Sequence, residues 1–143
     1  MAKLLEQLTN IWTARVLVMF GLVAGYVPIS STFDHIGDED SLLTETSFLP
    51  SHSYYHFFRE GVGDLTASAV ILAIIFMAPK FRSPAMWWIM LITMFGFYAP
   101  FWIGAPFMVE LRAPFIGAEI AHLRMAIPAL LGCFLIRRHY FST

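Results

Sequence analysis

Four long runs of apolar residues divide the chain, at 11–29, 62–79, 84–104 and 119–136. At a rise of about 1.5 Å per residue, runs of this length can cross a hydrocarbon core about 30 Å thick. The backbone of such a segment must satisfy its own hydrogen bonds, and the runs lack the alternation of membrane strands. The pattern predicts an all-α polytopic membrane protein: a single domain, 1–143, forming a four-transmembrane-helix bundle.

The connection after the first run is long and polar. It covers residues 30–60 and holds one base, Arg59, against a larger set of acids: Asp34, Asp38, Glu39, Asp40, Glu45 and Glu60. Asp40 and the serine after it precede two leucines, a pattern typical of a helix cap. We expect a short surface helix near 41–48, ended by Pro50.

The other connections differ in length and character. Residues 80–83 form a tight basic turn, whereas 105–118 mix prolines and charges with apolar residues. The pattern leaves open whether 105–118 enters the membrane. The residues from Pro28 to Ser31 lack the small-x-small pattern of a signal-peptide cleavage site, so we expect the first helix to be retained.

Basic residues predict the orientation. With four helices, one membrane side receives six of the nine Lys and Arg residues, and Arg15 can snorkel towards it; these six are Lys3, Arg15, Lys80, Arg82, Arg137 and Arg138. The acidic connection lies on the other side. The positive-inside rule therefore places both termini and the 80–83 turn in the cytoplasm, with the chain in the plasma (inner) membrane.

Composition agrees with a membrane protein. Hydrophobic residues make up 58% of the chain and charged residues 13%, against about 45–50% and about 25% in soluble domains. The mean hydropathy is +0.67. A net charge of −1 without a basic run argues against a nucleic-acid partner. The single cysteine, Cys133, excludes a disulfide framework and a cysteine-rich metal site.

Candidate chemistry lies where the second and fourth runs meet the outer side. This candidate polar cluster consists of Glu60, Asp64, Glu119, His122 and Arg124. A charge inside a bilayer costs at least a few kcal/mol unless it is paired or hydrated, so we expect partners. One interpretation is an ion-pair cluster that joins the two helices, extended by Arg59, Glu110 and Arg112. The other is a polar pocket for a substrate, a quinone headgroup or a lipid headgroup.

A metal site and a haem site are more specific alternatives for the polar cluster. Glu119 and His122 form one Glu-x-x-His pair, whereas carboxylate-rich bundle sites use two. Further ligands would have to come from the second helix or the segment before it: Glu60, Asp64, His52 and His56. A haem between His56 and His122 would lie at the membrane edge, and the spacing of the acidic residues 34–40 does not match a calcium loop. The sequence therefore assigns no metal or cofactor.

The order of parts resembles a known family. The chain has a long connection after its first helix, and its second helix has a charged start (Phe58-Arg59-Glu60-Gly61-Val62-Gly63-Asp64). The second and third helices follow each other closely, and the chain ends in basic residues after the fourth. This arrangement is similar to the DoxX-like superfamily of small four-helix bacterial membrane proteins. The resemblance covers most of the chain as architecture and includes no diagnostic motif. It implies the fold, in a family with members linked to quinone-dependent oxidation of sulfur compounds, and it carries over no catalytic residue.

Two classes of function follow. We predict an accessory or structural subunit of a larger membrane complex, with other membrane subunits or a second copy as partners; Gly21 and Gly25 would permit close helix approach inside the bundle or at a dimer face. The alternative is an enzyme or carrier for a quinone or lipid-like substrate at the outer leaflet. There Arg124 would hold an oxyanion or headgroup and His122 would exchange protons.

Overall fold

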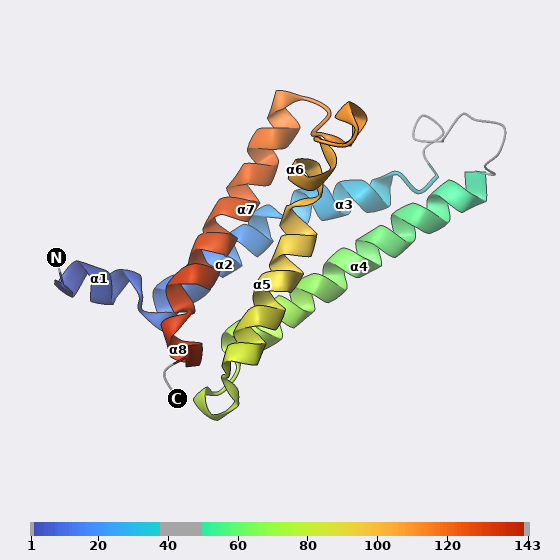
Figure 1. The fold of residues 1–143 in the computed structure, drawn as a ribbon. Coiled ribbons are helices and arrows are strands. Elements are labelled where there is room, and N and C mark those ends of the chain that lie inside the picture. Colours follow the sequence, from blue (N-terminus) through green and yellow to red (C-terminus); the bar gives the residue numbers. More distant parts are fainter. Residues whose placement is uncertain (1, 38–49, 142–143) are drawn as a thin grey trace.

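Helices make up all the regular structure in residues 2–37 and 50–141, the residues that a computed structural model of the chain describes. The predicted all-α class is confirmed for these residues (Figure 1). In chain order the elements are α1 (Ala2–Leu8), α2 (Ile11–Ala24), α3 (Tyr26–Asp34), α4 (Pro50–Phe76), the short 3₁₀ turn η2 (Pro79–Phe81), α5 (Pro84–Tyr98), α6 (Pro100–Gly104), the 3₁₀ turn η3 (Val109–Leu111), α7 (Ile116–Ile136) and α8 (Arg138–Phe141).

The first predicted helix is longer than expected and is interrupted. The side chain of Asn10 accepts a hydrogen bond from a backbone N–H in the first turn of α2, which fixes the helix start. Gly25 ends α2 and precedes α3. Proline has no N–H to donate and its ring crowds the carbonyl four residues earlier, so Pro28 accounts for the break. The helix then continues to Asp34, beyond the predicted end at residue 29.

The second helix begins twelve positions before the predicted start at residue 62. Pro50 begins α4, where its missing N–H costs no helical hydrogen bond. The added turns pack against α3: the ring of Phe33 lies 6.3 Å from that of Phe58 and covers Gly61. The helix expected at 41–48 lies outside the described residues.

The third predicted helix, 84–104, is divided in two. Ser83 caps α5 by accepting a hydrogen bond from the N–H of Met86. Helix α5 ends at Tyr98, Ala99 is its C-cap, and Pro100 begins the short α6. Beyond it, α7 begins at Ile116, three residues before the expected start.

Small residues let α2 and α7 approach closely, and this is the most extensive helix contact in the described residues. A Cβ atom added at Gly21 would lie 2.5 Å from the carbonyl oxygen of Met125, and one at Gly132 would lie 2.8 Å from that of Ala14. Gly21 therefore acts inside the bundle, one of the two roles expected for the glycine pair. We call this contact the α2–α7 seam.

The other helices complete the core around the seam. Helix α5 packs against α4 and α7, α3 packs against α4, and α8 folds back against α5. The largest side chains that are fully buried come from five helices: Val18, Ile71, Ile75, Met90, Met94, Tyr98, Cys133, Ile136 and Tyr140.

Two stretches are long and apolar enough to cross a membrane by length and composition, Ile11–Asp34 and Ile116–Phe141. Helix α5 is apolar but shorter. Helix α4 is long, but its middle carries Arg59, Glu60 and Asp64. The four-span bundle thus remains a prediction beyond these two helices.

Candidate functional site

The five residues of the predicted polar cluster lie on two helices that do not pack extensively together. Glu60 and Asp64 are on α4, whose main neighbours are α5 and α3. Glu119, His122 and Arg124 are on α7, whose main neighbours are α2 and α5. The amino-terminal halves of α4 and α7 diverge in Figure 1. The structure therefore separates the cluster into an α4 group and an α7 group.

His122 is buried, with 6% of its surface exposed, and its Nε2 is in hydrogen-bond contact with the carbonyl oxygen of Tyr98. Tyr98 is the last residue of α5, where helix carbonyls lose their ordinary donors. The N–H of Trp102 donates to the carbonyl of Ala99 instead. His122 thus completes the end of α5.

Glu119 lies one turn before His122 and contacts the same region. The indole Nε1 of Trp102 donates to Oε1 of Glu119 at 2.9 Å, and the indole ring lies 5.1 Å from the His122 ring, edge to face. Glu119 and His122, three residues apart on α7, share a helix face and this contact. We call this group, completed by Tyr98, the α5–α7 corner.

The two acids of the α4 group stand apart from the corner. Asp64 is half-buried and Glu60, one turn earlier, is exposed and acts on it as a like charge. Arg59 contacts Nδ1 of His56 at 3.2 Å and lies over the ring of Tyr55. Within the described residues, Asp64 forms no hydrogen bond and no ion pair.

No metal site arises from these residues. Within residues 2–37 and 50–141, no group of three or more His, Cys, Asp or Glu side chains could hold a metal ion. The side chains of His52 and Glu110, proposed as additions to the cluster, lie outside the described part of the chain.

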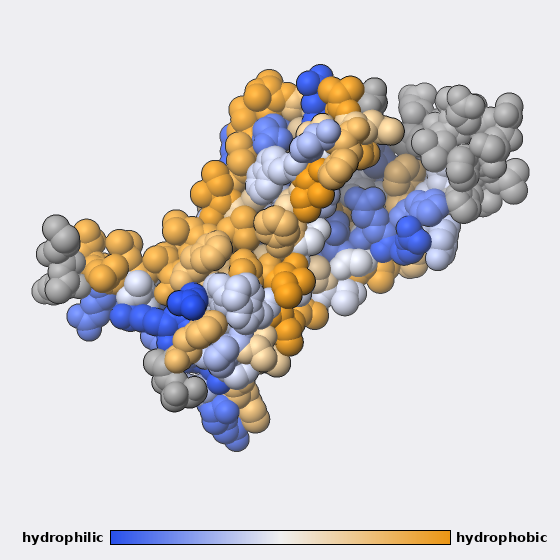
Figure 2. All heavy atoms as spheres, viewed as in Figure 1, coloured by the Kyte–Doolittle hydropathy of each residue, from blue (hydrophilic) through white to orange (hydrophobic). Residues whose placement is uncertain are grey.

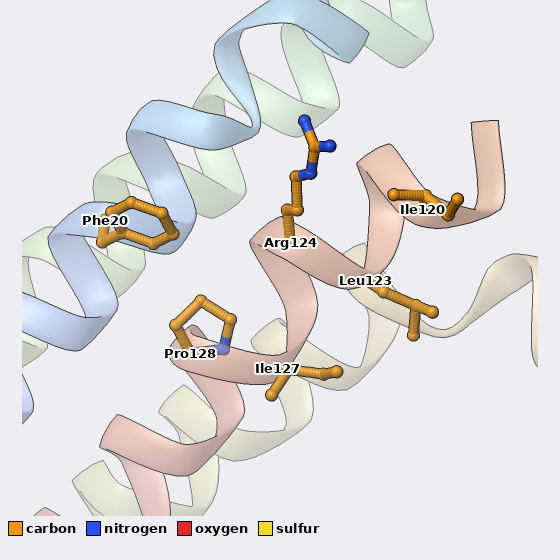
Figure 3. Close-up of a pocket in the computed structure, with 6 residues that line it drawn as sticks. All are labelled: Phe20, Ile120, Leu123, Arg124, Ile127 and Pro128. Atoms are coloured by element: carbon orange, nitrogen blue, oxygen red, sulfur yellow. The ribbon is translucent and has the colours of Figure 1, made fainter. Parts of the chain in front are cut away.

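Arg124 borders an open groove between α2 and α7 with a volume of about 430 Å³ (Figure 3). The groove is lined by Phe20, Ile120, Leu123, Arg124, Ile127 and Pro128. The Arg124 side chain is exposed and makes no hydrogen bond or ion pair to any described residue. Arg124 and Asp64 are therefore not paired with each other, as the ion-pair interpretation of the cluster would have allowed.

A second polar group, which sequence reasoning missed, lies at the opposite end of the bundle. Arg15 does not extend freely: its Nε donates to the carbonyl of Ile75 at 3.1 Å, and the Tyr140 hydroxyl donates to that of Ile74 at 2.6 Å. Arg82 donates to the carbonyl of Met77. These side chains cap the carboxyl end of α4, and we call them the α4 cap.

The missed contacts left little signal in the sequence. Trp102 and Tyr140 read as apolar residues near helix ends, and only the return of α6 and α8 onto the bundle gives them polar partners. A tyrosine or tryptophan in an apolar run is nonetheless a cue, because its polar atom requires a partner when buried.

Comparison with known proteins adds no relative. No protein-family model, no curated protein and no solved structure matches this chain. The resemblance to the DoxX-like superfamily therefore stays a prediction, and the function has to be argued from the geometry.

Proposed function

We propose that the chain is an integral protein of the plasma (inner) membrane with four spans, and that it serves as an accessory or structural subunit of a larger membrane complex. The observation that carries the membrane placement is exposure of the most apolar helices. Only 22% of the most apolar window of Ile11–Asp34 is buried, and 39% of that of Ile116–Phe141. A core helix of a soluble protein would be mostly buried, so these faces require cover by lipid or by another protein.

The exposed apolar residues are arranged in stripes. On α2 and α3 they recur every three or four positions, the spacing of one helix face: Trp12, Val16, Phe20, Val23 and Val27. A second stripe follows α7: Ile116, Ile120, Ile127, Leu131 and Phe134. In Figure 2 the surface of α7 is mostly orange.

Retention of the first span is supported by the seam. Removal of α2 would uncover Gly132, Ala129 and Met125, which are buried and lie against it. A cleaved signal sequence would not be expected to build the core in this way.

The proposed orientation is supported by the gathering of basic residues at one end. Arg138 and His139 both contact the carbonyl of Thr9, at 3.1 and 2.9 Å, so the start of α2 lies beside α8. The 80–83 turn lies at the same end, because Arg82 belongs to the α4 cap with Arg15 and Tyr140. We therefore place this end, with both termini, in the cytoplasm.

A non-catalytic role is supported by the α5–α7 corner. His122 and Glu119 are the α7 residues best suited to proton transfer, and both contact neighbouring elements of the same chain. His122→Ala should lower the free energy of unfolding by about 1–3 kcal/mol, the cost of leaving a buried carbonyl without its donor. His122→Gln, which retains a donor, should recover part of the loss.

The alternative role, an enzyme or carrier for a quinone or lipid-like substrate, is favoured by one observation: Asp64 is half-buried without a partner among the described residues. The two roles differ in what accompanies the purified chain. We expect purification in mild detergent, followed by native mass spectrometry and an absorption spectrum, to yield a partner chain or a second copy at fixed stoichiometry. A lone chain that carries quinone, and that loses turnover on Asp64→Asn while staying folded, would contradict the subunit role.

A further inference from the structure

Arg124 lies on the outward face of α7. It falls between Ile120 and Ile127 in the exposed stripe, four residues after one and three before the other, so the three share a face. In the proposed membrane placement this face meets lipid. An unpaired charge facing lipid is strongly unfavourable, so a cation in this position requires an anion or water.

The groove beside the charged Arg124 side chain is otherwise lined by apolar side chains. Phe20 projects from α2, while Leu123, Ile127 and Pro128 come from α7, and the guanidinium extends from the edge of this apolar surface (Figure 3). Helix side chains tilt towards the helix amino terminus, which the proposed orientation places at the outer headgroups. The groove thus offers an open apolar surface with a cation on the headgroup side.

Pro128 adds a backbone acceptor at the same place. It has no N–H, so it cannot donate the helical hydrogen bond to the carbonyl of Arg124, four residues earlier. The carbonyl of Arg124 therefore lacks its usual helical donor.

We propose that the groove binds one anionic glycerophospholipid of the outer leaflet. The Arg124 guanidinium donates to the lipid phosphate, whose geometry it matches in a two-bond arrangement, and an acyl chain lies against Phe20 and Ile127. Charge complementarity selects an anion, and the apolar walls select a ligand with a hydrocarbon chain. This inference rests on the proposed membrane placement, and a volume of about 430 Å³ falls within the ordinary range of ligand sites.

The test is native mass spectrometry of the full chain in mild detergent, titrated with phosphatidylglycerol or with phosphatidylcholine. Both lipids carry the phosphate, but the choline ammonium of phosphatidylcholine offsets its charge beside Arg124, so we expect phosphatidylglycerol to bind about tenfold more tightly. Arg124→Gln should abolish the preference and Arg124→Lys should keep part of it. The matched control is Arg112→Gln, which removes an exposed charge on the same side and should keep the preference. Ile127→Trp should weaken the binding of both lipids, because the larger side chain would fill the groove.

Two results would overturn the inference: equal binding of the two lipids by the unchanged chain, or an Arg124→Gln variant that keeps the preference. Release of a partner chain by Arg124→Gln, with lipid binding unchanged, would also overturn it, because the arginine would then pair with a partner's carboxylate. Failure of the membrane placement is separately visible, since the chain would then be extracted from membranes by alkaline carbonate before any lipid is added.

Discussion

Each of the two helices of the α2–α7 seam carries one arginine, and the two side chains differ in burial and in hydrogen bonding. Arg15 on α2 is half-buried, bonds to the carbonyl of Ile75, and lies 4.6 Å from the ring of Trp12 and 4.9 Å from that of Phe76. Arg124 on α7 is exposed and has no hydrogen bond or ion pair within the described residues.

The difference comes from what each arginine faces. The last carbonyls of α4 lack helical donors and carry the negative end of the helix dipole, so a cation beside them is stabilised. Arg124 faces outward, and no helix end in residues 2–37 and 50–141 accepts a hydrogen bond from it. One arginine therefore completes the fold, whereas the other is available to a ligand or partner.

The largest expected effect comes from a substitution in the α2–α7 seam, which joins the helices that carry the two arginines. Gly21→Ala should lower the free energy of unfolding by about 3 kcal/mol, since the new methyl group would overlap backbone atoms of α7 that cannot move aside easily. Gly96→Ala is the control, because nothing lies within 4 Å of its added Cβ. Denaturant titration of both variants in detergent measures the difference; equal stability would contradict the close packing of the seam.

The next prediction compares the arginines directly. Arg15→Met should cost about 1.5–3 kcal/mol of stability, through loss of a charge-assisted hydrogen bond and of the ring contacts. Arg124→Met should change stability by less than about 0.5 kcal/mol, as surface substitutions do. The same titration in lipid-free detergent serves as the measurement. A larger loss for Arg124→Met would mean that Arg124, too, holds the fold together.

The smallest prediction separates two buried tyrosines, Tyr98 at the end of α5 and Tyr140 on α8. Tyr140→Phe removes the hydroxyl that caps α4 and should cost about 1 kcal/mol. Tyr98→Phe should be neutral or slightly stabilising, because the Tyr98 hydroxyl is buried without a hydrogen-bond partner in the described structure. Thermal unfolding of the pair is sufficient, and the reverse order would contradict the assigned hydrogen bonds.

Apolar runs predicted where helices lie, since burial of apolar surface is what a hydropathy pattern records. They missed the first turns of α4, because residues 50–61 are polar and are held by packing against Phe33, a contact distant in sequence. Pro50 was an ambiguous signal, because proline suits the start of a helix as well as the residue after its end.

The candidate site was predictable only within one helix. The spacing of Glu119 and His122 was sufficient to place them together, and both contact Trp102. The interpretation of the five residues as one ion-pair cluster assumed that equal depth implies contact. Depth does not determine which helices are neighbours, and here α7 packs against α2 and α5 rather than chiefly against α4.

The central claim, a membrane chain with its basic end in the cytoplasm, is tested most directly by cysteine accessibility. Cys133 is fully buried, and Cys133→Ala provides a background for Arg112→Cys and Lys80→Cys, both at exposed positions. We predict that a membrane-impermeant maleimide labels the cysteine at 112 in intact cells and the cysteine at 80 only after permeabilisation. Labelling of both from outside, or recovery of the chain in the soluble fraction, would contradict the account.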